Sequence, residues 1–294
     1  MSDVTAVGPL GLALSGGTLK AAAHVGILQG LHLLGIRPDR VAGTSAGSLV
    51  AVLYAHGRGP DEMIQVIRRF PGPFLLDYGF PLATTLAALW SRWCHPSRPL
   101  RLPGGLLRGR RLERYVRGLI GSRRPVMPYY ILATDLFSGR PVALTNDPRA
   151  KALGFCPVDD PALAVRSSCA LPGIFTPVPL GDTLLTDGGI RDYVPVQVLR
   201  RAGCRRVIAV NLHRLDAHWR PDTPAHVIAR ALEILLHESV TADTAGDDVI
   251  TLTPRLPPMT WWSFDQLMQC VRAGRLCVAE NRDRLIAWLN RAQP

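Results

Sequence analysis

Short apolar runs and segments of helical periodicity alternate along the chain of 294 residues. Continuous apolar runs with the length of buried strands occur at 10–14, 129–134, 205–212 and 248–252. Apolar residues recur at helical spacing in 19–34, 46–56, 61–70, 109–120, 222–243 and 264–290. This alternation predicts an α/β fold with a mostly parallel central sheet and helices on both faces.

The chain has no internal repeat and no low-complexity linker, which predicts one domain over residues 8–294. The segment 71–108 interrupts the alternation, because it is rich in Pro, Gly and large apolar residues and has basic flanks. A loop of this length inside a compact domain usually has a function. We expect either a lid or membrane-contacting insertion, or a helix with loops that packs on the core.

The charge of the chain favours anionic partners. Lys and Arg number 34 against 23 Asp and Glu, for a net charge of +11, and 47% of the residues are hydrophobic. A basic surface suits phospholipid headgroups or nucleic acid. Because no zinc-knuckle spacing, helix-turn-helix or basic aromatic strand is recognisable, we expect contact with a lipid surface and no nucleic-acid partner.

Six cysteines are scattered without a CxxC pair or a histidine cluster, so we expect reduced, buried thiols and no metal site; they are Cys94, Cys156, Cys169, Cys204, Cys270 and Cys277. The first ten residues lack the pattern of a signal peptide, and no window of about eighteen apolar residues predicts a spanning helix. These features predict a cytoplasmic protein, with peripheral contact at the inner face of the membrane.

The stretch "VAGTSAGSL" contains a G-x-S-x-G pattern, in which Gly43 and Gly47 flank Ser45. A nucleophilic serine on a sharp strand-to-helix turn has a strained backbone and needs neighbours without bulk. The helix that follows would direct unpaired amides at the serine. The pattern predicts a nucleophile at Ser45, and the alternative is a glycine-flanked helix start.

A second strand–turn–helix precedes this one, with Gly16 and Gly17 at its corner. Glycines there allow backbone N–H groups to point outward together and to hold a developing oxyanion. We expect the amides of Gly16, Gly17 and Thr18 to form this hole, with Lys20 adding positive charge. A dinucleotide phosphate loop is not indicated, because Thr18 and Ala21 occupy glycine slots of G-x-G-x-x-G.

The stretch "TLLTDGGIRDYVPV" places Asp187 at the end of an apolar run and before Gly188 and Gly189. Alone, it fits an ordinary Asp-Gly turn. Together with the two glycine corners, it predicts a carboxylate base. Such a base must be held close to Ser45 and away from bulk water.

These three motifs, in this order, resemble the patatin-like phospholipase family of Ser–Asp dyad lipid acyl hydrolases. The likeness includes "LALSGGTLKAAAHVGILQGLHLLGI", "GTSAGS", "DGG", "RSSCALPGIFTPV" and "LLRGRRLERYVRGLI". The segment "FDQLMQCVRAGRLCVAENRDRL" is similar to the family's closing helix, predicted over 264–290.

The resemblance implies a three-layer α/β/α fold, a lipid substrate, and neither a cofactor nor a catalytic histidine. It also implies that Ser45 is the nucleophile and Asp187 the base. The chain departs from the family at Thr18 and Ala21, where glycine is usual. A positive φ is strained in residues with a Cβ, so either only Gly16 and Gly17 adopt one, or the hole is altered.

Two other functions compete with a Ser–Asp acyl hydrolase. One is a Ser-His-Asp esterase that uses His213, which follows the apolar run 207–212. The other is a catalytically weak, lipid-binding or regulatory module, which the departures at Thr18 and Ala21 favour.

Tryptophans mark two candidate membrane contacts. Trp261 and Trp262 lie side by side in a Pro-rich stretch, and the alternative is that they pack on the closing helix. The second set lies in the segment 71–108 and comprises Trp90, Trp93, Arg92 and Arg98.

Overall fold

The computed structural model describes residues 8–77, 105–215, 220–221, 223–260 and 262–291. The second tryptophan set, Cys94, Trp261 and most of the segment 71–108 lie outside the described residues. The two alternatives for that segment therefore stay predictions.

Five adjacent parallel strands extend from one side of a nine-stranded sheet, in the order β11 (Val249–Leu252), β10 (Arg206–Val210), β1 (Leu10–Leu14), β2 (Arg40–Thr44) and β4 (Tyr129–Asp135). The remaining strands continue beyond β4 and are β5 (Pro141–Thr145), β6 (Cys156–Pro157), β8 (Val178–Leu180) and β9 (Thr183–Asp187). Both β5 and β9 run antiparallel to β4. A separate pair joins β3 (Gly105–Leu107) to β7 (Gly173–Phe175).

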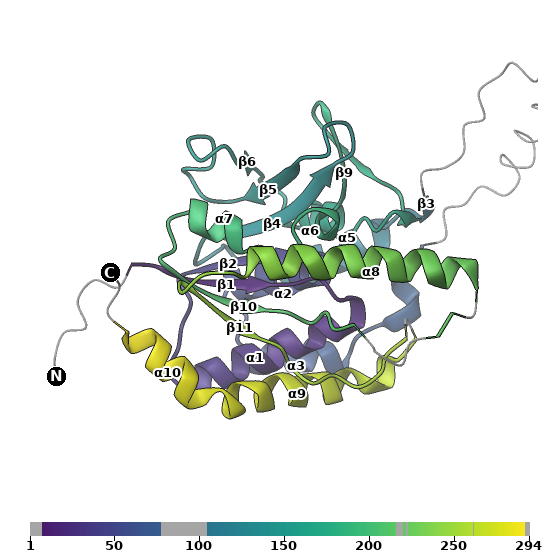
Figure 1. Cartoon of the computed structure of the whole chain (residues 1–294). Coiled ribbons are helices and arrows are strands. Elements are labelled where there is room, and N and C mark those ends of the chain that lie inside the picture. Colours follow the sequence, from purple (N-terminus) through teal and green to yellow (C-terminus); the bar gives the residue numbers. More distant parts are fainter. Residues whose placement is uncertain (1–7, 78–104, 216–219, 222, 261, 292–294) are drawn as a thin grey trace, which may run out of the picture.

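Helices cover both faces of this sheet, as Figure 1 shows. One face carries α1 (Ala22–Leu33), α2 (Ala46–Ala55), α3 (Pro60–Arg68), α5 (Arg110–Ile120), α6 (Pro161–Ser168), α9 (Leu267–Glu280) and α10 (Arg282–Asn290). The other face carries α7 (Val196–Arg201) and α8 (Pro224–Asp243). The short 3₁₀ helices are η1 (Thr18–Ala21), η2 (Gly72–Leu75), η3 (Gly188–Ile190) and η4 (Phe264–Gln266). The expected three-layer α/β/α architecture with a mostly parallel sheet is confirmed.

The single closing helix expected over 264–290 is instead η4 followed by two helices, α9 and α10. The break falls at Asn281, whose side-chain amide donates to the Cys277 carbonyl at 2.9 Å. A side chain that bonds the backbone in this way competes with the next turn of helix. Of the described cysteines, all are free thiols, but Cys156 and Cys169 are half-buried rather than buried.

Helices α1 and α9 approach each other at glycines. A Cβ on Gly26 of α1 would lie 1.9 Å from the Val271 carbonyl oxygen of α9. A Cβ on Gly274 of α9 would lie 2.1 Å from the Ala23 carbonyl oxygen of α1. The last part of the chain thus packs directly against the helix that follows the first glycine corner.

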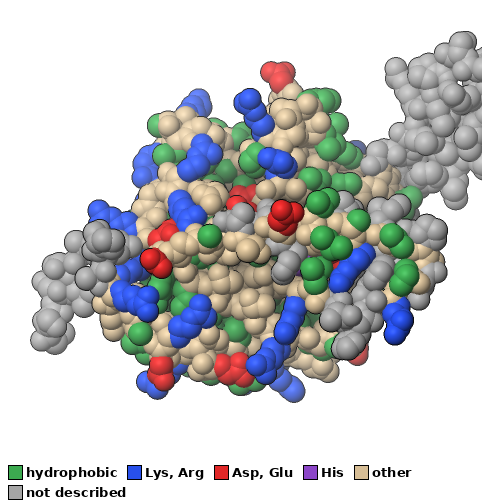
Figure 2. Space-filling view, viewed as in Figure 1, with side chains coloured by type: hydrophobic (Ala, Val, Ile, Leu, Met, Phe, Trp, Pro, Cys, Tyr) green, Lys and Arg blue, Asp and Glu red, His purple; other side chains and the backbone are tan. Residues whose placement is uncertain are grey.

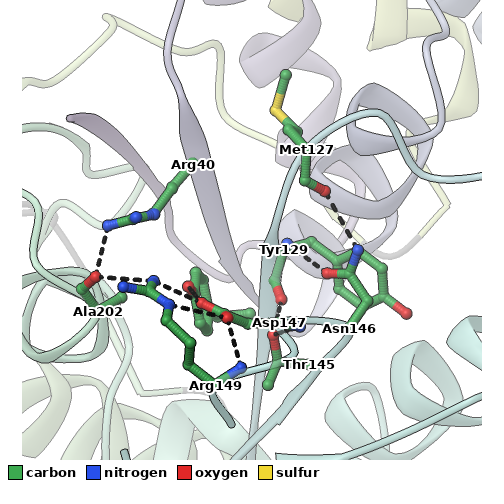
Figure 3. A network of polar contacts seen from close by, with 9 residues as sticks. Arg40, Met127, Tyr129, Thr145, Asn146, Asp147, Arg149 and Ala202 are labelled. Atoms are coloured by element: carbon green, nitrogen blue, oxygen red, sulfur yellow. Dashed lines mark hydrogen bonds and ion pairs between the residues drawn. The ribbon is translucent and has the colours of Figure 1, made fainter.

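Polar contacts hold the first residues of β4, at the opposite end of the strands from Ser45 (Figure 3). Arg149 binds Asp147 at 2.8 Å, and both Arg149 and Arg40 donate to the Ala202 carbonyl. Asn146 accepts a hydrogen bond from the Tyr129 backbone at 2.9 Å. These contacts tie β4 to β5 and to the end of α7, which holds the central strand in place.

Candidate active site

Strand β4 brings the ends of two other strands together. Thr44, the last residue of β2, pairs with Leu132, and Asp187, the last residue of β9, pairs with Ala133. Strand β5 occupies the other edge of β4. Strands β2 and β9 therefore meet end to end along one edge, and the register separates Thr44 from Asp187 by about 3.3 Å along β4.

Ser45 follows β2 directly and is the first residue before α2. Its φ of 51° and ψ of −127° lie in a strained region for a residue with a Cβ. A Cβ on Gly47 would lie 2.4 Å from the Ser15 carbonyl oxygen, and one on Gly43 would lie 2.6 Å from the Gly47 carbonyl oxygen. Both glycines of the pattern are thus required by close backbone packing, as expected for a sharp turn.

Asp187 is buried, with 3% of its surface exposed. Burial raises the pKa of Asp187 to about 6, against the opposing effects of the Ser45 hydroxyl and the Gly189 N–H. Oδ1 accepts the Gly189 N–H at 2.8 Å, and Oδ2 has no hydrogen-bond partner among the described residues. The Ser45 hydroxyl is near enough to affect this pKa, although no hydrogen bond joins the two side chains in this structure. Catalytic hydrogen bonds often tighten only when substrate binds.

The two glycines after Asp187 are required by different close contacts. A Cβ on Gly188 would lie 2.2 Å from the Leu132 carbonyl oxygen. A Cβ on Gly189 would lie 3.0 Å from Oδ1 of Asp187. A side chain at either position would push the carboxylate away from β4.

The first glycine corner has two amides available. Gly16 N–H donates to the Tyr193 carbonyl at 3.3 Å, whereas the N–H groups of Gly17 and Thr18 find no acceptor within the described part of the chain. Lys20 N–H donates to the Gly17 carbonyl at 3.0 Å. Gly16 itself lies against the nucleophile, since a Cβ there would be 3.4 Å from Ser45 Cβ.

The positive φ angles at this corner belong to Gly17 (148°) and Thr18 (49°), not to Gly16 and Gly17. Thr18 thus adopts the strained conformation in spite of its branched side chain. Ala21 has an ordinary helical φ of −58° and needs no glycine.

Two residues for which the sequence predicted no role, Ser168 and Tyr193, hold the site together, and Cys169 lies beside it. Ser168 Oγ accepts the Ser45 N–H at 2.8 Å and donates to the Leu132 carbonyl at 2.5 Å. Tyr193 donates its hydroxyl to the Gly16 carbonyl at 2.9 Å. Cys169 lies close by, with Sγ 4.0 Å from Ser48 Oγ. Ser168 and Cys169 belong to "RSSCALPGIFTPV" and Tyr193 to the aspartate stretch, but no spacing rule distinguishes them there.

The histidines lie in different surroundings. His24 is buried, and a ring nitrogen contacts the Ser15 carbonyl at 2.8 Å. Burial lowers the pKa of His24 to about 4, so this ring is neutral at pH 7. His213 packs edge-on against Tyr193, with ring centroids 5.9 Å apart. Neither oxygen of Asp187 accepts a hydrogen bond from a histidine among the described residues.

The comparisons with known proteins match this architecture. The patatin-like phospholipase family matches residues 12–200. The uncharacterized protein YqhO of Bacillus subtilis is 31% identical over 217 residues, which cover 67% of this chain and 69% of YqhO. An uncharacterized NTE family protein of Mycobacterium tuberculosis, Rv2565, is 28% identical over 210 residues. That match covers 70% of this chain, but the chain spans only 30% of the relative's length.

The fold is also that of a solved protein. VipD from Legionella pneumophila aligns with 94% of this chain and 67% of its own, with a TM-score of 0.52 and 17% identity. The family match spans more than half of the chain and contains the strand ends that carry Ser45 and Asp187. The chain therefore belongs to the patatin-like phospholipase family.

Proposed function

We propose that this protein is a serine lipid acyl hydrolase, which cleaves fatty-acyl esters of phospholipids or related lipids through Ser45 and Asp187. The observation that carries the proposal is the end-to-end meeting of β2 and β9 on β4. It holds a hydroxyl on a strained turn next to a buried carboxylate with an unpartnered oxygen.

In the proposed reaction, Ser45 Oγ attacks the ester carbonyl carbon while its proton passes to Oδ2 of Asp187. The amides of Gly17 and Thr18 donate to the oxyanion, because they are the free N–H groups at the glycine corner. Asp187 then returns the proton to the departing alcohol as the carbon–oxygen bond breaks. Water, deprotonated by Asp187, attacks the acyl-enzyme, and Asp187 returns this proton to Ser45 Oγ as the bond to Ser45 breaks and the fatty acid is released.

The pKa of Asp187, raised to about 6 by burial, suits this role. A carboxylate with an ordinary pKa is a weak base at pH 7, and a higher pKa brings it nearer to the operating pH. At pH 7 the group is still mainly ionised and can accept the proton.

Labelling with a fluorophosphonate probe tests the proposal directly. We expect the native protein to be labelled at Ser45 and to hydrolyse a phospholipid or p-nitrophenyl ester. Ser45→Ala should abolish labelling, and Asp187→Asn should lower both labelling and hydrolysis by a factor on the order of 100 or more. Folded native protein that neither reacts with the probe nor hydrolyses any ester would favour the lipid-binding module.

The variant His213→Ala separates the dyad from a Ser-His-Asp triad. We expect it to keep its esterase activity, because no histidine of the described part of the chain bonds the Asp187 carboxylate. Near-total loss of activity in a folded His213→Ala protein would favour the triad. Lipidomics of native protein against Ser45→Ala, each incubated with total membrane lipid, identifies the headgroup.

Transient contact with a membrane surface is part of the proposal. Several large apolar side chains are exposed: Phe74, Leu106, Ile190 and Trp262. Ile190 lies three residues after Asp187, and the Trp262 ring contacts Phe264, which contacts Phe70. Figure 2 shows hydrophobic side chains gathered towards the end of the molecule where β3 and the start of α8 lie. None of the described helices is both long and apolar enough to cross a bilayer.

A further inference from the structure

An apolar cavity begins at Ala46, the residue after Ser45, and extends between α1, α2 and α3. Its wall on α2 consists of Ala46, Leu49, Val50 and Leu53. This spacing puts all four side chains on one face of the helix. Leu19, the residue after Thr18, also lines the cavity. The near end of the cavity therefore lies beside both the glycine corner and the turn that carries Ser45.

The direction of the cavity follows from the helices around it. Helix α2 starts at the nucleophile and runs away from it, so Ala46 marks the near end and Leu53 the far end. Helix α3 starts near the far end of α1, where Gln29 donates to Asp61 at 3.1 Å, and Phe70, beyond the end of α3, packs on Phe264. Met63 therefore lies deep in the cavity and Phe70 lies near its mouth. Met63 and Leu53 are 1% and 3% exposed, which closes the deep end with apolar side chains.

We infer that this cavity holds the acyl chain of the substrate and limits its length; the inference rests on the proposed hydrolase function. The helical rise of about 1.5 Å per residue puts Leu53 about 10 Å beyond Ala46. Carbons of an extended chain advance by about 1.3 Å each, given a carbon–carbon bond of about 1.5 Å, so about eight carbons fill this depth. The structure thus assigns a medium-chain acyl group to this cavity, and Leu53 and Met63 at its deep end set the limit of chain length.

The wall has no group that would favour a polar ligand. Apart from the Tyr115 hydroxyl, every lining side chain is a hydrocarbon or a thioether. A polar headgroup placed there would lose its hydrogen bonds to water without replacement. The headgroup must therefore leave the site on the opposite side of the scissile bond, towards solvent.

A series of p-nitrophenyl esters from butyrate to palmitate measures the depth. We expect kcat/KM to rise by about four-fold for each added methylene, the effect of transferring one methylene out of water. The rise should stop at about eight carbons, where the chain reaches Leu53 and Met63. A series without this rise, or one that continues unchanged to palmitate, would overturn the inference.

Two neighbouring residues of α3 provide a matched pair of variants. Val66 is half-buried and lines the cavity, whereas Gln65 is exposed. We expect Val66→Trp to lower the octanoate-to-butyrate ratio of kcat/KM by about ten-fold or more, since it blocks several methylene positions. Gln65→Trp, with the same added bulk outside the cavity, should leave the ratio unchanged. Met63→Ala should move this limit towards longer chains.

Binding of octanoate to the Ser45→Ala protein gives a readout that does not depend on catalysis. We expect Val66→Trp in this background to weaken octanoate binding and Gln65→Trp to have no effect. If the native protein hydrolyses no ester but octanoate binds in this Val66-dependent way, the hydrolase function fails and the cavity assignment stands. If esters are hydrolysed but neither the ratio nor binding responds to Val66→Trp, the cavity assignment alone fails.

Discussion

Ser45 and Thr18 are the two residues other than glycine with a positive φ in the described part of the chain. Both lie at the candidate active site, on the two corners that face each other. Backbone strain of about 1–3 kcal/mol persists only where surrounding contacts impose it. The Ser45 pattern is visible in the sequence because its glycine neighbours are required sterically. The positive φ at Thr18 is not visible in the sequence, because threonine has a branched side chain that disfavours a positive φ.

Ser168 makes one of the contacts that hold Ser45 in its conformation, and this contact can be tested alone. Ser168→Ala removes the acceptor of the Ser45 N–H, which costs about 1–3 kcal/mol when the amide is left unsatisfied. We expect kcat and the rate of fluorophosphonate labelling to fall by about ten-fold or more, with little change in KM. Ser168→Thr, which keeps the hydroxyl, should restore part of the activity.

The neighbouring variant Ser167→Ala is the control. Ser167 donates its hydroxyl to the Leu163 carbonyl within its own helix, and among the described residues its side chain makes no hydrogen bond to Ser45 or to β4. It should label at the native rate. Equal labelling rates for the two alanine variants would show that Ser168 does not position the nucleophile.

The pH dependence follows from the burial of Asp187. The carboxylate must be ionised to accept the Ser45 proton, and its pKa is raised to about 6. We expect kcat/KM to be level above pH 7 and to fall by about ten-fold per pH unit below 6. The profile should be the same in His213→Ala, whereas a triad would remove activity altogether. A profile level down to pH 4 would contradict the assignment of Asp187 as the base.

At the scale of elements, the strands β1, β4, β10 and β11 and the helices α1, α2, α3, α5 and α8 lie within a few residues of their predicted ranges. Their apolar runs and helical periodicity are long enough to be recognised from the local sequence alone. The edge of β4 that β2 and β9 share could not be predicted in this way. Thr44 and Asp187 are distant from each other in sequence, yet they pair with adjacent residues of β4. No local pattern encodes which strands share an edge, so the approach of Thr44 and Asp187 on β4 could be predicted only through the family resemblance.

The contact between α1 and α9 predicts a large effect of one methyl group. Gly274→Ala places a Cβ 2.1 Å from the Ala23 carbonyl oxygen, so the helices must separate. We expect the free energy of unfolding to fall by about 1–3 kcal/mol, as for other overpacked sites. Denaturant unfolding measures this change.

Gly118 of α5 supplies the matched control. It is exposed, and a Cβ there would meet nothing within 4 Å. Gly118→Ala should stabilise the protein by about 0.5–1 kcal/mol, the ordinary gain of alanine over glycine in a helix. A Gly274→Ala protein as stable as Gly118→Ala would show that α1 and α9 do not touch at these glycines.

At the scale of the whole molecule, charge and exposed apolar side chains act together. The net charge is +11, and Trp262 and Phe74 are 61% and 79% exposed. The Trp262 ring contacts Phe264, which contacts Phe70 in the wall of the apolar cavity. We expect lipid hydrolysis to be faster on anionic than on neutral vesicles and to fall as salt screens the charges. Equal rates on both vesicles at low salt would contradict this surface.

Trp262→Ser tests which end of the molecule faces the lipid. We expect it to weaken sedimentation with vesicles while leaving hydrolysis of a water-soluble ester unchanged. The control is Leu33→Ser, which removes a side chain that is 75% exposed at the far end of α1. If Leu33→Ser weakened vesicle binding as much, the end that carries Trp262 would not be the docking end.

The meeting of β2 and β9 on one strand also determines how the protein should lose its activity on heating. The distance between the hydroxyl and the carboxylate is set by ladder hydrogen bonds at the centre of the sheet, among the last to open when a domain frays locally. Ester hydrolysis should therefore persist through any early loosening of the periphery and disappear together with the cooperative melting of the sheet. An inactivation curve and a circular-dichroism melting curve for this protein should have the same midpoint.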